Sequence, residues 1–279
     1  MRVLITGIAG FVGSHLAEYA LKKNAEIFGT ILPNEPLNNI AHIKNQLTLF
    51  KCDITDAKKL ELAVKKSKPD FVFHLAAQSS VTHSWKIPQK TMQVNVIGTT
   101  NLLESLHRYT PSARVLLASS REVYGKVKKS DLPIKEKQPA KPANPYGISK
   151  LAMEFLGMQY YYKYGLEAII MRSFNLTGPR RPASFACSDW AEQLAEIELG
   201  LKEPKIEIGV VTALRDFTDV RDAVRAYWLA IQKCNPAEPY NLCSGKALKM
   251  KKVLEMILAL SDRDIKVVRD EKKVVKIDV

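Results

Sequence analysis

Short apolar runs alternate with longer amphipathic segments along the first 174 residues. The apolar runs, rich in β-branched and aromatic residues, lie at 3–5, 26–30, 47–50, 71–77, 114–118 and 167–172. Helical patterns lie between them at 14–21, 56–66, 91–108 and 146–164. Alternating strands and helices predict an α/β fold built on a doubly wound parallel sheet. The run at 71–77 is apolar enough for a strand that is buried on both faces.

The pattern changes after residue 174. A turn-rich segment at 175–182 precedes predicted helices at 188–200, 219–233 and 247–260 and short strands near 206–208 and 265–269. We therefore predict a first domain over 1–174 and a smaller region over 175–279 that is interleaved with it. The stretch 126–144 is rich in lysine and proline and lacks periodicity, which indicates a surface loop.

Glycines follow the first apolar run at once. They stand in the sequence Thr6-Gly7-Ile8-Ala9-Gly10-Phe11-Val12-Gly13. A strand, a glycine turn and a helix form the context of the dinucleotide-binding Rossmann fingerprint. The glycines let a pyrophosphate approach the helix N-terminus, whose N–H groups favour anions. The first domain is therefore predicted to bind NAD or NADP through Gly7, Gly10, Phe11, Val12 and Gly13.

The residues at the end of the second strand normally determine whether the cofactor is NAD or NADP. An acidic residue there would hold the ribose hydroxyls of NAD, and an arginine would hold the extra phosphate of NADP. Here the strand runs into Thr30-Ile31-Leu32-Pro33-Asn34, with neither, and Glu35 follows a proline turn. The sequence therefore leaves both NAD and NADP open.

Residues that follow the other strands are the next candidates, because ligands on such sheets sit at the carboxyl ends of the strands. Asp53 could accept a hydrogen bond from an adenine amino group, or it could cap the next helix, as Thr55 or Asp56 could. Ala76 and Ala77 are small, so a cofactor could lie close to them.

Tyr146 and Lys150 stand four residues apart at the start of a helical pattern. On a helix, both side chains project from one face, one turn apart. An ammonium beside a phenol favours the phenolate, so we expect the pKa of Tyr146 to fall from its ordinary value of about 10. Such a tyrosine can exchange a proton with a sugar or alcohol oxygen. The spacing is common on helices, but the glycine loop adds a hydride carrier and Ser119-Ser120 adds a hydroxyl. Together they predict proton-coupled hydride transfer.

Composition and charge narrow the remaining classes of function. The chain has 279 residues, 46% of them hydrophobic, and a net charge of +13. No run of about twenty apolar residues could span a membrane, and glycine appears too soon after Met1 for a signal peptide. The charge suits a phosphate-rich small ligand, and without a nucleic-acid motif we expect no nucleic-acid or membrane partner. Four scattered cysteines lack metal-ligand spacing and indicate reduced thiols in a cytoplasmic protein with no metal site.

Several motifs cover nearly the whole chain in one order. They are Thr6-Gly7-x-x-Gly10-Phe11-x-Gly13, Asp53-Ile54, His74-Leu75-Ala76-Ala77, Asn95-x-x-Gly98-Thr99, Ser119-Ser120-x-x-Val123-Tyr124-Gly125, Tyr146-x-x-x-Lys150 and Arg215-Asp216-Phe217. In these motifs the chain resembles the extended short-chain dehydrogenase/reductase family, also called the NAD-dependent epimerase/dehydratase family. The resemblance implies nucleotide-diphosphate sugars as substrates. It implies that Ser120 hydrogen-bonds the sugar oxygen, Tyr146 exchanges its proton and Lys150 holds the nicotinamide ribose. The further cofactor contacts that it implies are Asp53, Ile54, Leu75, Ala76, Ala77 and Tyr146.

Two stretches, 78–85 and 215–222, are similar to the GDP-mannose branch of this family. That branch holds GDP-mannose 4,6-dehydratase and the reductase of GDP-6-deoxy-4-keto-hexose, and 215–222 and 240–246 resemble the reductase more. Glu122 stands where the dehydratase keeps the base that removes the C5 proton, but the reductase also carries a glutamate there. The residues expected at the substrate are Ser79, Ser80, Asn175, Arg180, Arg181 and Arg215. The three arginines are candidates for the diphosphate.

Three departures from the pattern of this branch bear on the substrate pocket. Asn175-Leu176 stands where the branch has Asn-His, the arginines that bind NADP near the second strand are absent, and the chain stops at Val279 where relatives continue. The last point indicates a naturally short or truncated chain. The resemblance also implies a homodimer, because members of the family often pair through helices such as 91–108 and 146–164 in a four-helix bundle.

The leading hypothesis is hydride transfer between a nicotinamide and C4 of a nucleotide-diphosphate sugar. The enzyme would be a GDP-4-keto-6-deoxyhexose reductase or a GDP-mannose 4,6-dehydratase. A nucleotide-sugar 4-epimerase of the UDP-glucose type is the alternative within the family. A non-catalytic dinucleotide-binding regulator is the alternative of another class, and the complete set of Ser120, Tyr146 and Lys150 argues against it.

Overall fold

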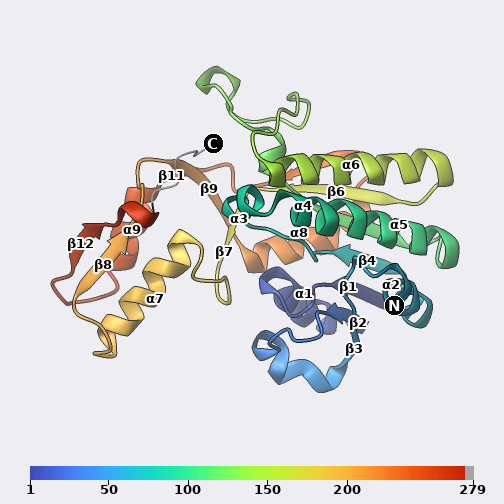
Figure 1. Cartoon of the computed structure of the whole chain (residues 1–279), viewed down its shortest axis with the longest axis horizontal. Helices are drawn as coiled ribbons and strands as arrows, with labels where there is room; N and C mark the ends of the chain where they lie inside the picture. Colours follow the sequence, from blue (N-terminus) through green and yellow to red (C-terminus); the bar gives the residue numbers. More distant parts are fainter. Residues whose placement is uncertain (274–279) are drawn as a thin grey trace. The chain divides into compact units, whose positions relative to one another are not determined.

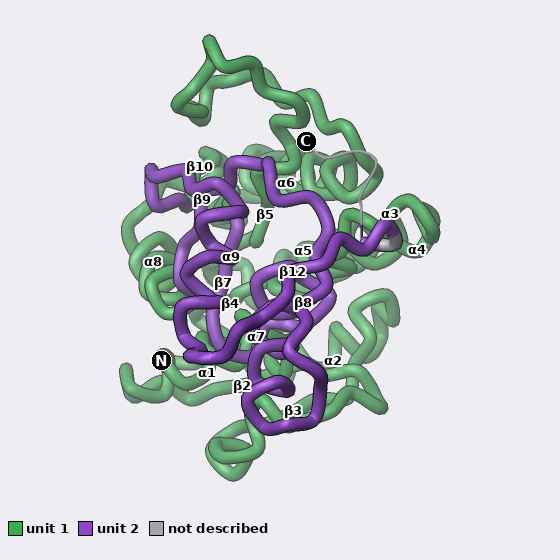
Figure 2. Tube along the Cα trace, turned by 90° about the vertical axis from the view of Figure 1, so that its left-hand side faces the viewer, with its two compact units in different colours: residues 1–174, 221–242, 279 green, residues 175–220, 243–278 purple. Residues whose placement is uncertain are grey.

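The computed structural model describes residues 1–273 and forms two compact units (Figures 1 and 2). The first unit contains 1–174 and 221–242, and the second contains 175–220 and the described residues from 243 onward. Residues 221–242, which belong to the predicted C-terminal region, are part of the first unit. Residues 274–279 of that predicted region lie outside the described residues.

A seven-stranded sheet forms the centre of the first unit. Its strands lie in the order β10 (Pro239–Leu242), β6 (Ala168–Ser173), β5 (Arg114–Ser120), β4 (Phe71–His74), β1 (Arg2–Thr6), β2 (Glu26–Ile31) and β3 (Leu47–Lys51). Each neighbouring pair is parallel, and the order reverses between β1 and β4, so the predicted doubly wound sheet is confirmed. Strand β10 was missed, because its four residues carry little pattern and only pairing with the distant β6 defines it.

Helices cover both faces of this sheet (Figure 1). On one face, α1 (Phe11–Leu21) and α8 (Val220–Lys233) meet at Trp228, whose ring stacks on Phe73 with centroids 6.1 Å apart and meets Tyr19 edge-on. On the other face, α2 (Ala57–Ser67), α5 (Gly98–Tyr109) and α6 (Pro145–Tyr164) pack in one apolar cluster that includes Val72. Because adjacent residues of a strand point to opposite faces, Val72 and Phe73 are both buried, as predicted for β4.

The two long predicted helices form with local signals at their ends. The predicted helix 91–108 consists of α4 (Pro88–Met92), a π-helical turn (Gln93–Ile97) and α5. Helix α6 begins after Asn144, whose side chain accepts a hydrogen bond from the Gly147 N–H at 2.8 Å, and ends at Gly165 with φ 71°. A six-residue helix, α3 (Val81–Lys86), was not predicted because its apolar pattern is too short. Among the described helices, none is long and apolar enough to cross a membrane.

The described part of the second unit contains two small sheets and two α-helices. Strands β7 (Asn175–Thr177), β9 (Leu214–Asp219) and β11 (Ala247–Lys249) form one sheet, and β8 (Lys205–Ile208) pairs with β12 (Lys266–Arg269). Helices α7 (Ala186–Glu198) and α9 (Met250–Leu258) close an apolar cluster around Trp190. The predicted helix at 247–260 starts late, at Met250, because β11 pairs with β9.

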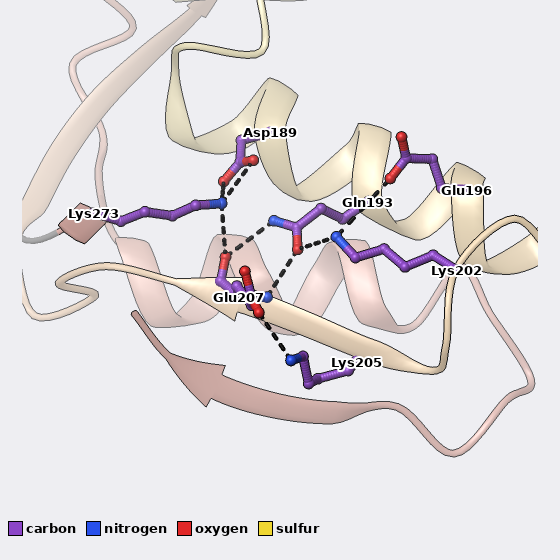
Figure 3. Close-up of polar contacts among 7 residues, drawn as sticks. All are labelled: Asp189, Gln193, Glu196, Lys202, Lys205, Glu207 and Lys273. Carbon is purple, nitrogen blue, oxygen red and sulfur yellow. Dashed lines mark hydrogen bonds and ion pairs between the residues drawn. The ribbon is translucent and has the colours of Figure 1, made fainter. Parts of the chain in front are cut away.

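Polar contacts fasten α7 to β8 in this unit (Figure 3). The amide of Gln193 pairs with both backbone groups of Glu207, donating to its carbonyl at 3.0 Å and accepting from its N–H at 2.9 Å. Lys202 donates to the same amide oxygen, and Lys273 bonds both carboxylate oxygens of Asp189. The side chain of Gln193 therefore takes the place of a neighbouring strand at Glu207.

Strand β4 ends at His74 rather than at residue 77, where the sequence predicts its end. The hydroxyl oxygen of Thr6, at the end of β1, accepts the N–H groups of Leu75 and Ala76, each at 3.1 Å. These two N–H groups bond a side chain instead of a neighbouring strand, so the hydrogen-bonded pairing of β4 ends at His74. The Thr6 hydroxyl lies 2.9 Å from Nδ1 of His74, and because its oxygen already accepts two bonds, it donates its own proton to that nitrogen.

His74 is consequently a neutral, buried link in a chain of hydrogen bonds. With Nδ1 accepting, Nε2 carries the ring proton and donates to the Thr99 hydroxyl at 3.0 Å, which donates to the Asn95 carbonyl at 2.6 Å. Burial, assisted by the charge of Lys150, lowers the pKa of His74 to about 3. The chain therefore joins the end of β1 to the π-helical turn without any charge.

We predict that His74 makes the fold acid-sensitive. Its pKa in the folded chain lies below the ordinary value of about 6.5, so the unfolded chain binds the proton first. The stabilisation is complete above pH 6.5 and is lost as the pH falls toward 3. The stabilisation lost between pH 6.5 and pH 5 amounts to about 2 kcal/mol. The His74→Gln variant should lose less stability over this pH range than the parent chain does, as measured by thermal unfolding.

The exposed His83 offers a matched control, since His83→Gln should keep the acid sensitivity of the parent chain. An equal loss of melting temperature for His74→Gln and the parent would contradict a neutral, buried His74.

Candidate active site

Helix α6 places the predicted catalytic pair against the end of β5. Tyr146 hydrogen-bonds the hydroxyl of Ser120, the last residue of β5. The Nζ atom of Lys150, one turn later, donates to the Ala118 carbonyl at 2.7 Å and lies 5.7 Å from the centre of the Tyr146 ring. Gly147 permits the close approach of the helix, because a Cβ there would lie 2.5 Å from the Glu122 carbonyl oxygen. The structure therefore brings Ser120, Tyr146 and Lys150 together, as predicted.

The electrostatics of the pair differ from the sequence prediction. Burial of its hydroxyl raises the pKa of Tyr146, the bond from Ser120 opposes this, and the charge of Glu122 adds to the rise. Burial also lowers the pKa of Lys150 to about 8, and the charge of Glu154 acts in the opposite direction. The predicted fall of the Tyr146 pKa is therefore wrong for the chain by itself. The cause is desolvation, which the spacing of two residues on a helix does not reveal.

Glu122 is held by two donors beside this pair. One carboxylate oxygen accepts from Arg121 at 2.8 Å and the other from the Asn144 amide at 2.8 Å. The same Asn144 caps α6, so it fixes both the carboxylate and the helix that carries Tyr146. Sequence reasoning missed Asn144 as a site residue, although an asparagine directly before Pro145 is a helix-start signal that could have found it.

The glycine loop is shaped for close approach of a ligand. Gly7 has φ 69°, which an L side chain rarely adopts, and a Cβ on Gly13 would lie 2.3 Å from the Gly7 carbonyl oxygen. Gly10 precedes α1 and gives no side-chain cap to the first helical turn, which holds Phe11, Val12 and Gly13. Such a turn favours an anion.

The other predicted cofactor residues lie after β3 and β4. A Cβ on Gly7 would lie 3.0 Å from Cα of Ala76, so the loop and the half-buried segment Leu75-Ala76-Ala77 are in contact. Asp56 caps α2, accepting from the Lys59 N–H at 3.1 Å, so Asp53 does not have that role. Asp53 instead accepts the N–H and hydroxyl of Thr55 through one carboxylate oxygen. Ile54 is buried and packs against the start of α5 at Gly98.

The predicted substrate segment at 78–80 is anchored by a residue that the sequence analysis noted only as part of a motif. Asn95, in the π-helical turn, accepts the Gln78 N–H at 2.8 Å and donates to the Gln78 carbonyl and to Ser149 of α6. Ser80 caps α3, and Ser79 is exposed. The structure therefore ties this segment to the helix that carries Tyr146.

The remaining predicted substrate residues belong to the second unit. Asn175 on β7 donates to the Asp216 carbonyl at 3.0 Å, and Arg215 on β9 donates to the Leu214 carbonyl at 2.9 Å. Arg180 has φ 70° in the turn after β7. The guanidinium of Arg181 lies 4.1 Å from the centre of the Phe185 ring, and burial lowers its pKa to about 10.

Asp216 joins β9 to the segment after β10. Its carboxylate accepts from the N–H and hydroxyl of Ser244 and from the N–H of Gly245, at 2.8, 2.9 and 2.8 Å. Arg215 and Asn175 stand on paired strands, with Asn175 opposite Phe217. Asp216 is the neighbour of Arg215 on β9, so its bonds to Ser244 and Gly245 fix the strand that carries Arg215.

Comparisons with known proteins agree with this arrangement. The sequence model of the family described as GDP-mannose 4,6 dehydratase matches residues 4–278. GDP-6-deoxy-D-mannose reductase of Pseudomonas aeruginosa is 33% identical over 269 residues, 96% of this chain and 83% of that protein. A structure of RMD from Pseudomonas aeruginosa complexed with NADPH superposes with a TM-score of 0.84 at 30% identity, covering 100% of this chain and 87% of the other. Thermus thermophilus UDP-glucose 4-epimerase complexed with NAD has a TM-score of 0.86 at 29% identity, covering 96% and 86%. The chain therefore belongs to the GDP-mannose 4,6-dehydratase family of extended short-chain dehydrogenases/reductases.

Proposed function

We propose that this chain is an NAD(P)-dependent oxidoreductase acting at C4 of a GDP-linked hexose. The reaction is either reduction of a GDP-4-keto-6-deoxyhexose or the 4,6-dehydration of GDP-mannose. The observation that carries the proposal is the contact of Tyr146 and Lys150 with the carboxyl end of β5, at Ser120 and Ala118. The relatives named for the reductase and the dehydratase support the choice of a GDP-sugar.

The residues of the glycine loop fit a dinucleotide. Gly7, Gly10 and Gly13 carry no side chain, and the N-cap residue Gly10 makes no side-chain bond to the first turn of α1, which suits a pyrophosphate. A bound nicotinamide would supply or accept the hydride at C4. At the sugar oxygen, the Ser120 hydroxyl would polarise the C–O bond while the Tyr146 hydroxyl gives or takes the proton. The ammonium of Lys150 would stabilise the phenolate that Tyr146 becomes after giving its proton.

Glu122 bears on the choice between the two reactions. A dehydratase needs a base for the C5 proton, and a reductase does not. The carboxylate is held by Arg121 and Asn144 and lies close enough to act on the Tyr146 pKa, which suits a base at the carbon next to C4. The greater resemblance of 215–222 and 240–246 to the reductase instead favours reduction. Because these two observations point to different reactions, the substrate has to be decided by product identification.

A homodimer is part of the proposal. Helix α6 carries a stripe of exposed apolar side chains at Ile148, Phe155 and Tyr162, with Phe155 59% exposed. Beside it, an apolar surface depression is lined by Met92, Val96 and Ile97 of the neighbouring helices, among others, with Ala152 of α6. Exposed apolar stripes on neighbouring helices indicate a protein contact, and a second copy can cover both by twofold symmetry.

Tyr146→Phe should abolish most turnover while keeping the cofactor site. Loss of the proton donor is expected to lower kcat by about 10²- to 10⁴-fold. NAD(P)H affinity, measured by fluorescence titration, should change by less than about threefold because the change removes one hydroxyl. Tyr162→Phe, on the exposed side of the same helix, is the matched control and should leave both quantities unchanged. Normal turnover of Tyr146→Phe would sink the proposed proton transfer.

Glu122→Gln should separate the two reactions. A dehydratase is expected to lose about 10²-fold or more in turnover of GDP-mannose and in deuterium uptake at C5 from D₂O. A reductase should keep its rate on the 4-keto sugar within about tenfold. Mass spectrometry of the products, with each cofactor tested, gives the readout. If the parent chain converts UDP-glucose and neither GDP-sugar, the epimerase alternative replaces the proposal.

Phe155→Glu should dissociate the dimer. It would bury two unpaired carboxylates at a twofold interface, which is expected to weaken association by about 100-fold or more. Sedimentation velocity at micromolar concentration measures the state, and Leu199→Glu, at an exposed leucine of the second unit, serves as control. A parent chain that sediments as a monomer would refute the dimer.

A further inference from the structure

A third residue of α6 contacts the end of β5 beside the candidate catalytic pair. Glu154 follows Lys150 by four residues, as Lys150 follows Tyr146, so the three side chains form one stripe. Tyr146 bonds Ser120, Lys150 bonds the carbonyl of Ala118, and Glu154 accepts the hydroxyl of Ser119. Side chains from three turns of the helix thus bond three neighbouring residues of the strand, in the order Ser120, Ala118 and Ser119. The proposed reaction uses the first two of these helix residues and leaves Glu154 without a role.

Arg172 fixes the carboxylate of Glu154 from the neighbouring strand. It stands directly opposite Ser119 in the pairing of β5 with β6. Its Nε donates to one carboxylate oxygen at 3.0 Å, and a terminal nitrogen donates to the other at 2.7 Å. Glu154 is 1% exposed and Arg172 is 5% exposed. A buried ion pair of this kind is weak evidence for a stabilising role, because desolvation offsets the attraction. Its place beside Lys150 suggests another reason for it.

The second terminal nitrogen of Arg172 extends the network away from the helix. It donates to the Tyr124 hydroxyl at 3.0 Å and to the Glu136 carbonyl at 3.1 Å. Tyr124 donates in turn to the Asn241 side chain at 2.7 Å. The guanidinium of Arg172 is therefore fixed by polar partners on both sides. The carboxylate of Glu154 cannot move without breaking its bonds to this fixed guanidinium.

Lys150 has one carboxylate that acts on it in the described structure. Burial lowers its pKa, and the charge of Glu154 is what opposes that effect. Two further titratable groups are linked to Lys150: Tyr146 on the same helix and the neutral His74 of β4, whose pKa its charge helps to lower. Arg172 of β6 pairs with Glu154. Glu122 and Arg121 pair with each other and act on Tyr146.

We infer that Glu154 is a positioning residue of the candidate active site: its buried carboxylate, held by Ser119 and Arg172, is the counter-charge of Lys150 and sets the register of α6 on β5. The inference rests on the proposed role of Lys150 in hydride transfer. Arg172 holds Glu154 in place but has the same sign of charge as Lys150. Loss of Glu154 and loss of Arg172 should therefore act on Lys150 in opposite directions, which a purely structural ion pair would not do.

The test compares Glu154→Gln, Arg172→Met and the double variant by NMR of ¹³C-labelled lysine, with the Lys150 signal assigned from Lys150→Arg. Glu154→Gln should lower the titration midpoint of Lys150 by about one pH unit or more. Arg172→Met should raise it, because a cation is removed and the carboxylate stays. The double variant, which removes both charges, should titrate above Glu154→Gln and below Arg172→Met. Glu192→Gln, at an exposed glutamate of α7, is the matched control and should titrate as the parent does.

This set of variants distinguishes a loss of folding from a change in the titration of Lys150. If Glu154→Gln fails to fold because Arg172 is left unpaired, the double variant decides, since it removes both members of that ion pair. The pH profile of kcat/KM should shift with the NMR midpoint in each variant. A Lys150 midpoint in Glu154→Gln equal to that of the parent, or one in the double variant no lower than that of Arg172→Met, would overturn the inference. Absence of GDP-sugar turnover in the parent chain would refute the proposed function and leave the NMR comparison valid.

Discussion

The contact of α6 with the end of β5 is the constraint on which the site depends. Tyr146, Lys150 and Glu154 bond Ser120, Ala118 and Ser119, so the helix can occupy one register on the strand. A shift of α6 along β5 would remove all three contacts and leave a charged and a phenolic group buried without partners. The Asn144 cap and the bare backbone at Gly147 fix the start of the helix where this register requires it.

Two polar systems hold this contact, and they differ in charge. The chain Thr6–His74–Thr99–Asn95 is neutral throughout and connects the glycine-loop strand to the π-helical turn, where Asn95 reaches Ser149 of α6. The Glu154–Arg172 pair is charged and connects α6 to β6. The neutral system can be buried because every hydrogen bond is made, and the charged one because each ion has its partner. Lys150 lies between them with its charge opposed by burial and supported by Glu154.

The family resemblance and the physical description support different parts of the account. The glycine loop, the match over residues 4–278 and the likeness to a reductase and an epimerase establish the family. They do not say how a buried lysine and a buried tyrosine share their charge in this chain. That follows from burial, from the bond between Ser120 and Tyr146, and from the carboxylates at positions 122 and 154.

The sequence by itself determined what depends on residues close together in the chain. The strand, glycine turn and helix at 3–21, the spacing of Tyr146 and Lys150 and the glycine at the end of α6 are local patterns, and each formed as predicted. The tertiary structure alone decided what depends on distant segments. Strand β10 exists through β6, β4 ends early because Thr6 takes its N–H groups, and Arg172 finds Glu154 only across the sheet. The direction of the Tyr146 pKa belongs to this second class, because desolvation is a property of all the groups packed around a side chain and not of its neighbours in sequence.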